Sequence, residues 1–276
     1  MTTAGDLRRS NPTFSLRRIG TLVLRYWYVL RGSWPRLVDL AYWPTLQMIV
    51  WGFMTQFLAT QTNYVAQAFG VLLSAALLWD VLFRGQIALS ISFLEDIWSR
   101  NLGHLFVSPL RPIEMLAALM TMSLIRTLIG VVPASLLAIA FFGFSVYSLG
   151  LTLVGFFFAL IMFGWAIGLM VCGLVLRHGM GAESLAWASM VAIMPLCAVY
   201  YPVDVLPVWL QYVAWAIPPA HVFEGMRAVL VHGTVRGDLL AWAFALDAVF
   251  LALGAATFLY CFHGARERGR LLQSGE

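Results

Sequence analysis

A series of long apolar stretches, separated by short segments that carry arginine, constrains this chain more than any other feature. A helix that crosses a bilayer needs roughly 20 mostly apolar residues. Of the 276 residues, 61% are hydrophobic and only 11% are charged, whereas soluble domains carry about 25% charged residues. We therefore expect an all-α membrane protein with six transmembrane helices, approximately over residues 40–60, 66–94, 112–142, 149–176, 185–201 and 239–262.

The arginines indicate how these helices are oriented. Cytoplasmic loops of membrane proteins are enriched in basic residues. The N-terminal segment, the segment around Arg100 and Arg111, the turn at Arg177 and the C-terminal tail fall on one side if six helices alternate. The other side receives Arg227 and Arg236, balanced locally by Glu224 and Asp238. Both termini are thus predicted to be cytoplasmic.

The N-terminal segment, residues 1–38, is rich in arginine and precedes a single membrane domain predicted over residues 39–276. Apolar residues recur there at helical spacing between the arginines, namely Leu16, Ile19, Val23, Trp27 and Leu30. This pattern favours an amphipathic helix in the cytoplasmic membrane interface, with its arginines among anionic head groups. The alternative is a solvated basic tail.

The outer segment, residues 202–237, contains two apolar runs of about half the length that a crossing needs. They cover residues 208–217 and 222–231 and are separated by Pro218 and Pro219, which exclude one straight helix. Two arrangements remain open: a pair of re-entrant half-helices, or one amphipathic cap on the membrane surface.

Charged residues inside membrane spans are costly and mark pathways or specific pairs, and Asp80, Arg84 and Arg126 are the candidates for such a role. Asp80 and Arg84 are four residues apart on one helical face and are expected to form an internally neutral pair. Arg126 has no acid within reach on its own helix except Glu114, three turns away, so we expect a partner on another helix, and Asp80 is the preferred one.

The segment LEDIWSRNLGHLFVSPLRP, residues 94–112, is polar and lies between two predicted spans. As a helix from Leu94 it places apolar and polar residues on opposite faces, with its acids at the positive end of the helix dipole. Ser108-Pro109 would end it. Periodicity alone leaves two interpretations open, a connector floating on the membrane surface or an apolar face offered to the groove of a soluble partner.

Several classes of function are disfavoured by the same residues. The chain has no lysine and hence no GxxxxGK[ST] loop, so any ATP chemistry must come from another chain. The arginines are dispersed rather than gathered on one soluble face, so no nucleic-acid partner is expected. His221, Glu224 and His232 lack the HExxH arrangement, and no metal site is expected.

The pattern FLEDIWSRNLGHLFVSPLRPIE resembles the cytoplasmic loop of ABC-2 type transporter permeases. The resemblance implies the membrane subunit of an ABC exporter in a bacterial inner membrane, working as a dimer of identical copies, with separate ATPase subunits that bind ATP and Mg. It also implies re-entrant helices before the last span and a coupling helix, residues 94–107, that inserts into the ATPase. The implied ATPase-coupling residues are Glu95, Asp96, Ile97, Trp98, Arg100, Asn101, Leu102, Gly103, His104, Leu105, Phe106 and Pro109.

Two other functions are compatible with the residues. A lipid-modifying membrane enzyme would use Asp80, Arg84 and Arg126 as a buried polar site, and it would be active without an ATPase. A proton-coupled carrier would use Asp80 and Arg126 as a relay, and its transport would follow a pH gradient. Membrane lipids are expected partners in each case.

Overall fold

The computed structural model describes residues 15–61, 63–99, 101, 110–182 and 184–267, and within them the chain is helical and contains no strand. The long helices are α2 (Trp34–Gln61), α3 (Asn63–Trp98), α5 (Pro112–Phe142), α6 (Leu151–His178) and α10 (Gly237–Glu267). The shorter ones are α1 (Leu16–Arg31), α7 (Leu185–Ile193), α8 (Val208–Trp215) and α9 (Pro218–His232), with single 3-10 turns η2 (Val146–Leu149), η3 (Met180–Ala182) and η4 (Val203–Val205). The all-α prediction is confirmed.

Four of these helices are long and apolar enough to cross a membrane: α3 over Gly70–Trp98, and the whole of α5, α6 and α10. A multi-pass membrane protein is therefore the architecture that the fold supports. Helix α2 has the same length as α6 but includes Arg36, Asp39 and three glutamines, and it is less apolar. The predicted count of six spans is not confirmed among the described residues.

The predicted fifth span, residues 185–201, is not one continuous helix, and that prediction is wrong. Helix α7 ends at Ile193, and turns follow as far as Tyr201. Nine helical residues rise only about 13 Å, less than half of the hydrocarbon thickness. Pro195 lies two residues beyond the helix end, where it cannot donate the hydrogen bond that would continue the helix.

Helix α6 is the centre of the bundle, with α3 on one side and α10 on the other. Glycines allow these helices to approach closely. A Cβ at Gly164 of α6 would lie 2.8 Å from the carbonyl oxygen of Leu82 in α3, and a Cβ at Gly254 of α10 would lie 2.6 Å from the carbonyl oxygen of Ala166 in α6. Backbone therefore touches backbone on both sides of α6, as is common between membrane helices.

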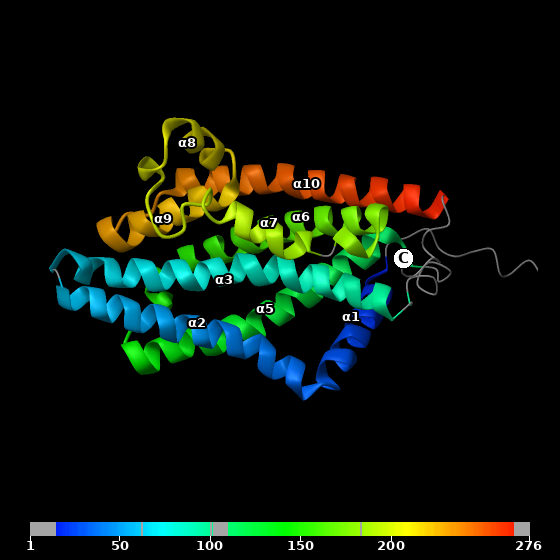
Figure 1. The fold of residues 1–276 in the computed structure, drawn as a ribbon, viewed down its shortest axis with the longest axis horizontal. Helices are drawn as coiled ribbons and strands as arrows, with labels where there is room; N and C mark the ends of the chain where they lie inside the picture. The colour runs from blue at the N-terminus through cyan, green and yellow to red at the C-terminus, as the bar shows by residue number, and fades with distance from the viewer. Residues whose placement is uncertain (1–14, 62, 100, 102–109, 183, 268–276) are drawn as a thin grey trace, which may run out of the picture.

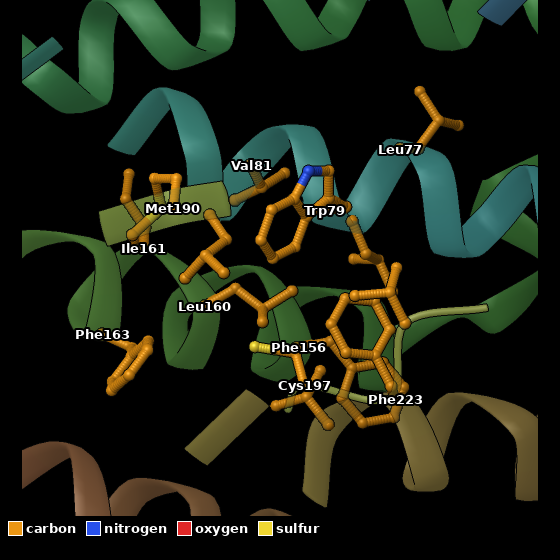
Figure 2. Packing of buried hydrophobic residues seen from close by; sticks show 14 of the residues in the cluster. Leu77, Trp79, Val81, Phe156, Leu160, Ile161, Phe163, Met190, Cys197 and Phe223 are labelled. Carbon is orange, nitrogen blue, oxygen red and sulfur yellow. The ribbon is translucent and has the colours of Figure 1, made fainter. Parts of the chain in front are cut away.

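The main core lies between α3, α6, α7, α9 and the turns that follow α7. Figure 2 shows Trp79 and Val81 of α3 facing Leu160 and Ile161 of α6, with further side chains from the other elements closing the cluster. These additional residues include Met190 of α7, Cys197 of the turns and Phe223 of α9. The irregular segment after α7 is thus part of the core rather than a surface loop.

The arginine-bearing helix α1 and the end of α10 that carries Arg266 lie at one end of the bundle. Figure 1 places α1, the end of α3 and the end of α10 at this end, and α8 and α9 towards the opposite end. We call these the arginine-rich end and the cap end. The membrane side that each end faces stays a prediction, as does the division into residues 1–38 and 39–276.

The two apolar runs of residues 202–237 form separate helices, broken at Ile217 and Pro218 as the double proline predicts. They differ in environment. Helix α9 is buried against α3, α6 and α10, whereas α8 projects from the bundle with most of its side chains exposed. That the two helices re-enter the membrane stays a prediction.

Candidate functional site

The candidate coupling segment begins inside helix α3. This helix continues without interruption from Phe93 through Glu95 to Trp98, so the prediction that a new helix starts at Leu94 is wrong. Glu95 and Asp96 therefore lie at the C-terminal end of a helix, where the dipole disfavours acids. The other predicted coupling residues, Arg100, Leu102, Gly103, His104, Leu105, Phe106 and Pro109, lie outside the described residues, and the predicted coupling helix over 94–107 is not tested there.

Cations from other helices stabilise Glu95 in this position. Its carboxylate lies 3.0 Å from Nη1 of Arg36 in α2 and 3.1 Å from Nη2 of Arg126 in α5. The prediction that Arg126 pairs with Asp80 is thus wrong. The side chain of Arg126 is only 6% exposed, so this charge-assisted contact is shielded from water. One carboxylate joins three helices.

Asp96 makes the corresponding contact with α1. Arg25 forms an ion pair with its Oδ1, and the hydroxyl group of Tyr26 donates to its Oδ2 at 2.5 Å. The guanidinium group of Arg25 also lies 4.9 Å from the centre of the Tyr26 ring, within the range of a cation–π contact. Burial and the neighbouring Asp96 raise the pKa of Tyr26 well above its ordinary value, so its hydroxyl group remains a donor.

Glu114, at the start of α5, provides a second link to α1. It accepts hydrogen bonds from the backbone N–H of Ser15 at 2.9 Å and from the Arg18 side chain at 2.8 Å. It also accepts from the backbone N–H of Arg111 at 3.1 Å, which caps α5. Glu114 is fully buried, so these donors replace the water that its carboxylate would otherwise bind.

These contacts together form a network at the arginine-rich end, which we call the acid clamp. It consists of the carboxylates of Glu95, Asp96 and Glu114 and of their partners Arg18, Arg25, Tyr26, Arg36 and Arg126. The clamp fixes α1 and α2 to the two helices, α3 and α5, that flank the candidate coupling segment. Sequence reasoning named Glu95 and Asp96 as contacts of an external partner, whereas here they bind residues of their own chain.

Trp98 is the described coupling residue that offers an apolar surface. Its side chain is 51% exposed at the end of α3, whereas the neighbouring Ile97 packs partly against the core. Asn101 is described but lies outside any helix. Trp98 therefore stands at the arginine-rich end with about half of its surface uncovered.

The intramembrane pair of α3 is formed as its spacing predicts. Nε of Arg84 lies 2.6 Å from Oδ2 of Asp80, and both side chains are nearly buried. Gly130 of α5 gives Arg84 its space, because a Cβ at this glycine would lie 3.0 Å from Nε of Arg84. The pair is therefore enclosed between α3 and α5, with its charges mutually neutralised.

A second polar network, at the cap end, holds the irregular segment after α7. Arg227 of α9 donates to the carbonyl oxygens of Ala198 and Val199, at 2.9 and 3.3 Å, and forms an ion pair with Glu224 at 3.0 Å. Glu224 in turn accepts from the backbone N–H of Val203 at 2.7 Å. The local balance of Arg227 by Glu224 is confirmed, as is that of Arg236 by Asp238.

Sequence reasoning missed the role of Arg227 towards the backbone. The available signal was the combination of Pro195 and Pro202, which leaves carbonyl groups between them without helical partners, and a nearby arginine in a segment of few charges. Ala198 adopts a left-handed backbone conformation with φ of 51°. Such a conformation is uncommon for a residue other than glycine and is held here by the surrounding contacts.

His221, which the sequence places near Glu224, belongs to the same end but has its own partner. Its Nε2 lies 2.9 Å from the carbonyl oxygen of Trp215, and its ring packs on the Trp215 ring with centroids 4.9 Å apart. Burial lowers the pKa of His221 below its ordinary value, which favours the neutral ring. His221 thus joins α8 to α9.

A model of the family described as ABC-2 type transporter matches residues 20–231, from within α1 to the end of α9, which is well over half of the chain. No curated protein matches the sequence.

Proposed function

Because this chain belongs to the ABC-2 type transporter family, we propose that it is the membrane-spanning permease subunit of an ATP-driven exporter. ATP and Mg bind to separate ATPase subunits, and two copies of the chain, identical in the simplest arrangement, enclose the translocation pathway. The arginine-rich end faces the cytoplasm of a bacterium, in its inner membrane, and receives the ATPase there.

The observation that carries this proposal is the family match together with the position of Trp98. The family works as a membrane component of transporters, and the end of α3 and the start of α5 lie at the arginine-rich end, where a cytoplasmic ATPase would meet the chain. Trp98 presents an uncovered aromatic surface at the beginning of that link. Aromatic residues of this kind are frequent anchors in protein interfaces.

The acid clamp would transmit a movement of the segment between α3 and α5 to the neighbouring helices. A push on the segment between α3 and α5 acts on Glu95, Asp96 and Glu114, whose partners lie on α1, α2 and α5. These helices then move together, because separating a pair such as Glu95 and Arg126 would leave a largely buried charge without its partner. The binding of ATP to the partner thereby biases the bundle between inward-facing and outward-facing states.

Affinity purification of the chain from its native membrane in mild detergent tests the proposal. We expect an ATPase subunit to co-purify and the isolated chain to hydrolyse no ATP. Replacing Trp98 by Glu removes the uncovered apolar contact and should abolish co-purification. The matched control is Trp209→Glu, which changes a tryptophan that is 67% exposed in α8 at the cap end. Equal retention of the ATPase by both variants would contradict the assignment of Trp98.

The dimer is tested separately. Cysteine cross-linking in native membranes, followed by mass measurement of the detergent complex, should give two copies of this chain per complex with two ATPase subunits. A complex with a single copy of the chain would refute the proposed assembly, while leaving the ATPase contact to be judged by the tryptophan variants.

A further inference from the structure

Asp247 of α10 is an acidic residue that belongs neither to the acid clamp nor to the polar network around Arg227 and Glu224 at the cap end. It is fully buried, and neither of its carboxylate oxygens has a hydrogen-bond partner in the described part of the chain. The other buried acids, Asp80, Asp96 and Glu114, each bond to an arginine. Asp247 therefore differs from them in having neither a hydrogen-bond donor nor an ion-pair partner among the described residues.

The position of Asp247 in the bundle limits the access of water to its carboxyl group. Asp247 lies ten residues after the start of α10, about 15 Å along the helix. It belongs to the buried stripe of α10 that includes Leu239, Ala243, Gly254 and Phe258 and packs on α6. Because α6 and α10 touch through their backbones at Gly254, their contact leaves little room for a chain of water molecules.

The elements that pack on α10 supply no cation for Asp247. Helix α6 has no acidic or basic residue before Arg177, close to its far end, and its thiol at Cys172 is also near that end. In α9, Arg227 and Glu224 are occupied by each other and by backbone groups, and His221 bonds to Trp215. His232, at the end of α9, is exposed. The charged residues of α10 itself lie at its two ends, and these are Asp238, Arg266 and Glu267 together with His263.

We infer that Asp247 is a proton-binding site, whose carboxyl group is neutral as long as α10 packs on α6. An ionised carboxylate without a cation or a hydrogen-bond donor is strongly disfavoured in an apolar interior, and such a group takes up a proton instead. The proton is released when water or a cation enters the contact between α6 and α10. A change in the packing of these two helices is thereby linked to the uptake or release of one proton.

A neutral Asp247 makes the stability of the folded chain depend on pH in one direction. In the unfolded chain an aspartate loses its proton above about pH 4, whereas the folded chain keeps the proton on Asp247. The folded state then binds more protons than the unfolded state, so stability falls as pH rises above this value. Asp247→Asn, a neutral side chain of the same shape, removes this dependence.

Thermal unfolding of the full-length protein in detergent, followed by tryptophan fluorescence at pH 6 and pH 8.5, tests the inference. We expect Asp247→Asn to have a higher Tm than the wild type, with a larger gap at pH 8.5 than at pH 6. Asp80→Asn serves as the control, because it breaks an ion pair and should lower Tm at both pH values.

Two outcomes would overturn the inference. A lower Tm for both Asp247→Asn and Asp247→Ala at both pH values would mean that Asp247 is ionised and paired with a group from elsewhere, such as a second copy of the chain. An identical Tm for Asp247→Asn and the wild type at both pH values would mean that the carboxyl group titrates as it does in the unfolded chain.

Discussion

Nη2 of Arg126, in the middle of α5, lies 3.1 Å from the carboxylate of Glu95 near the end of α3. Both side chains are largely buried, so removing one partner leaves a charge without compensation, at a cost of about 3–5 kcal/mol. We expect Arg126→Gln to lower Tm strongly and Glu95→Gln to recover part of the loss in the double variant. Thermal unfolding of the two single variants and of the double variant measures the coupling, which should exceed about 0.5 kcal/mol.

The matched control for this pair is Asp80→Asn, because Asp80 binds Arg84 and not Arg126. Its effect should add to that of Arg126→Gln without coupling. A strong coupling of Arg126 with Asp80, and none with Glu95, would contradict the contact between Arg126 of α5 and Glu95 of α3.

The hydrogen bond between Tyr26 and Asp96 should hold α1 in place. Tyr26→Phe removes a buried donor to a carboxylate and should cost about 1–3 kcal/mol. We expect the variant to insert normally, and α1 to become more sensitive to limited proteolysis from the arginine-rich side. Tyr28→Phe is the control, since the Tyr28 side chain is 60% exposed in the same helix. Equal protease sensitivity of the two variants would contradict a role for the Tyr26 hydroxyl group.

The close approach of α6 and α10 should tolerate no side chain at Gly254. A Cβ there would lie 2.6 Å from the carbonyl oxygen of Ala166, so Gly254→Ala must push the helices apart. Overpacking of this kind costs about 1–3 kcal/mol, which thermal unfolding detects. Gly264→Ala in the same helix meets no atom within 4 Å and should leave Tm unchanged or slightly raised.

Arg227 should keep the irregular segment after α7 closed. Arg227→Ala leaves the carbonyl groups of Ala198 and Val199 without donors and Glu224 without its cation. In a variant whose only cysteine is Cys197, which is fully buried, we expect faster reaction with a maleimide after this substitution. Arg236→Ala removes an exposed ion pair and should not change the rate. An unchanged rate in Arg227→Ala would refute the proposed role.

The sequence predicted contacts within one helix well. The pairs Asp80 with Arg84 and Glu224 with Arg227 follow from residues three or four apart, because the helix itself fixes their distance. Contacts between helices were not predictable in the same way. To predict the partner of Arg126, one would need to know how deep in the bundle each charged residue lies. Periodicity shows which face of a helix is buried, but it does not show how far that helix is shifted along its neighbour.

Two errors had a common origin in the placement of helix ends. The acids at Glu95 and Asp96 looked like the start of a helix, but α3 continues past them, and the clamp replaces the missing dipole stabilisation. Residues 185–201 looked like a span because they are apolar, yet Pro195 ends α7 early. Proline alone did not reveal this, since Pro44 and Pro133 lie inside continuous helices.

The interruption of the chain after α7 has a consequence for biogenesis. Residues 194–201 carry backbone carbonyl groups that a lipid environment cannot satisfy, and two of them are bonded only after Arg227 has been synthesised. We therefore expect that this segment does not pass from the translocon into lipid before α9 is present. The ribosome must produce α9 before this part of the chain reaches a stable state, so α7, the turns, α8 and α9 are expected to reach their final packing late and as one unit.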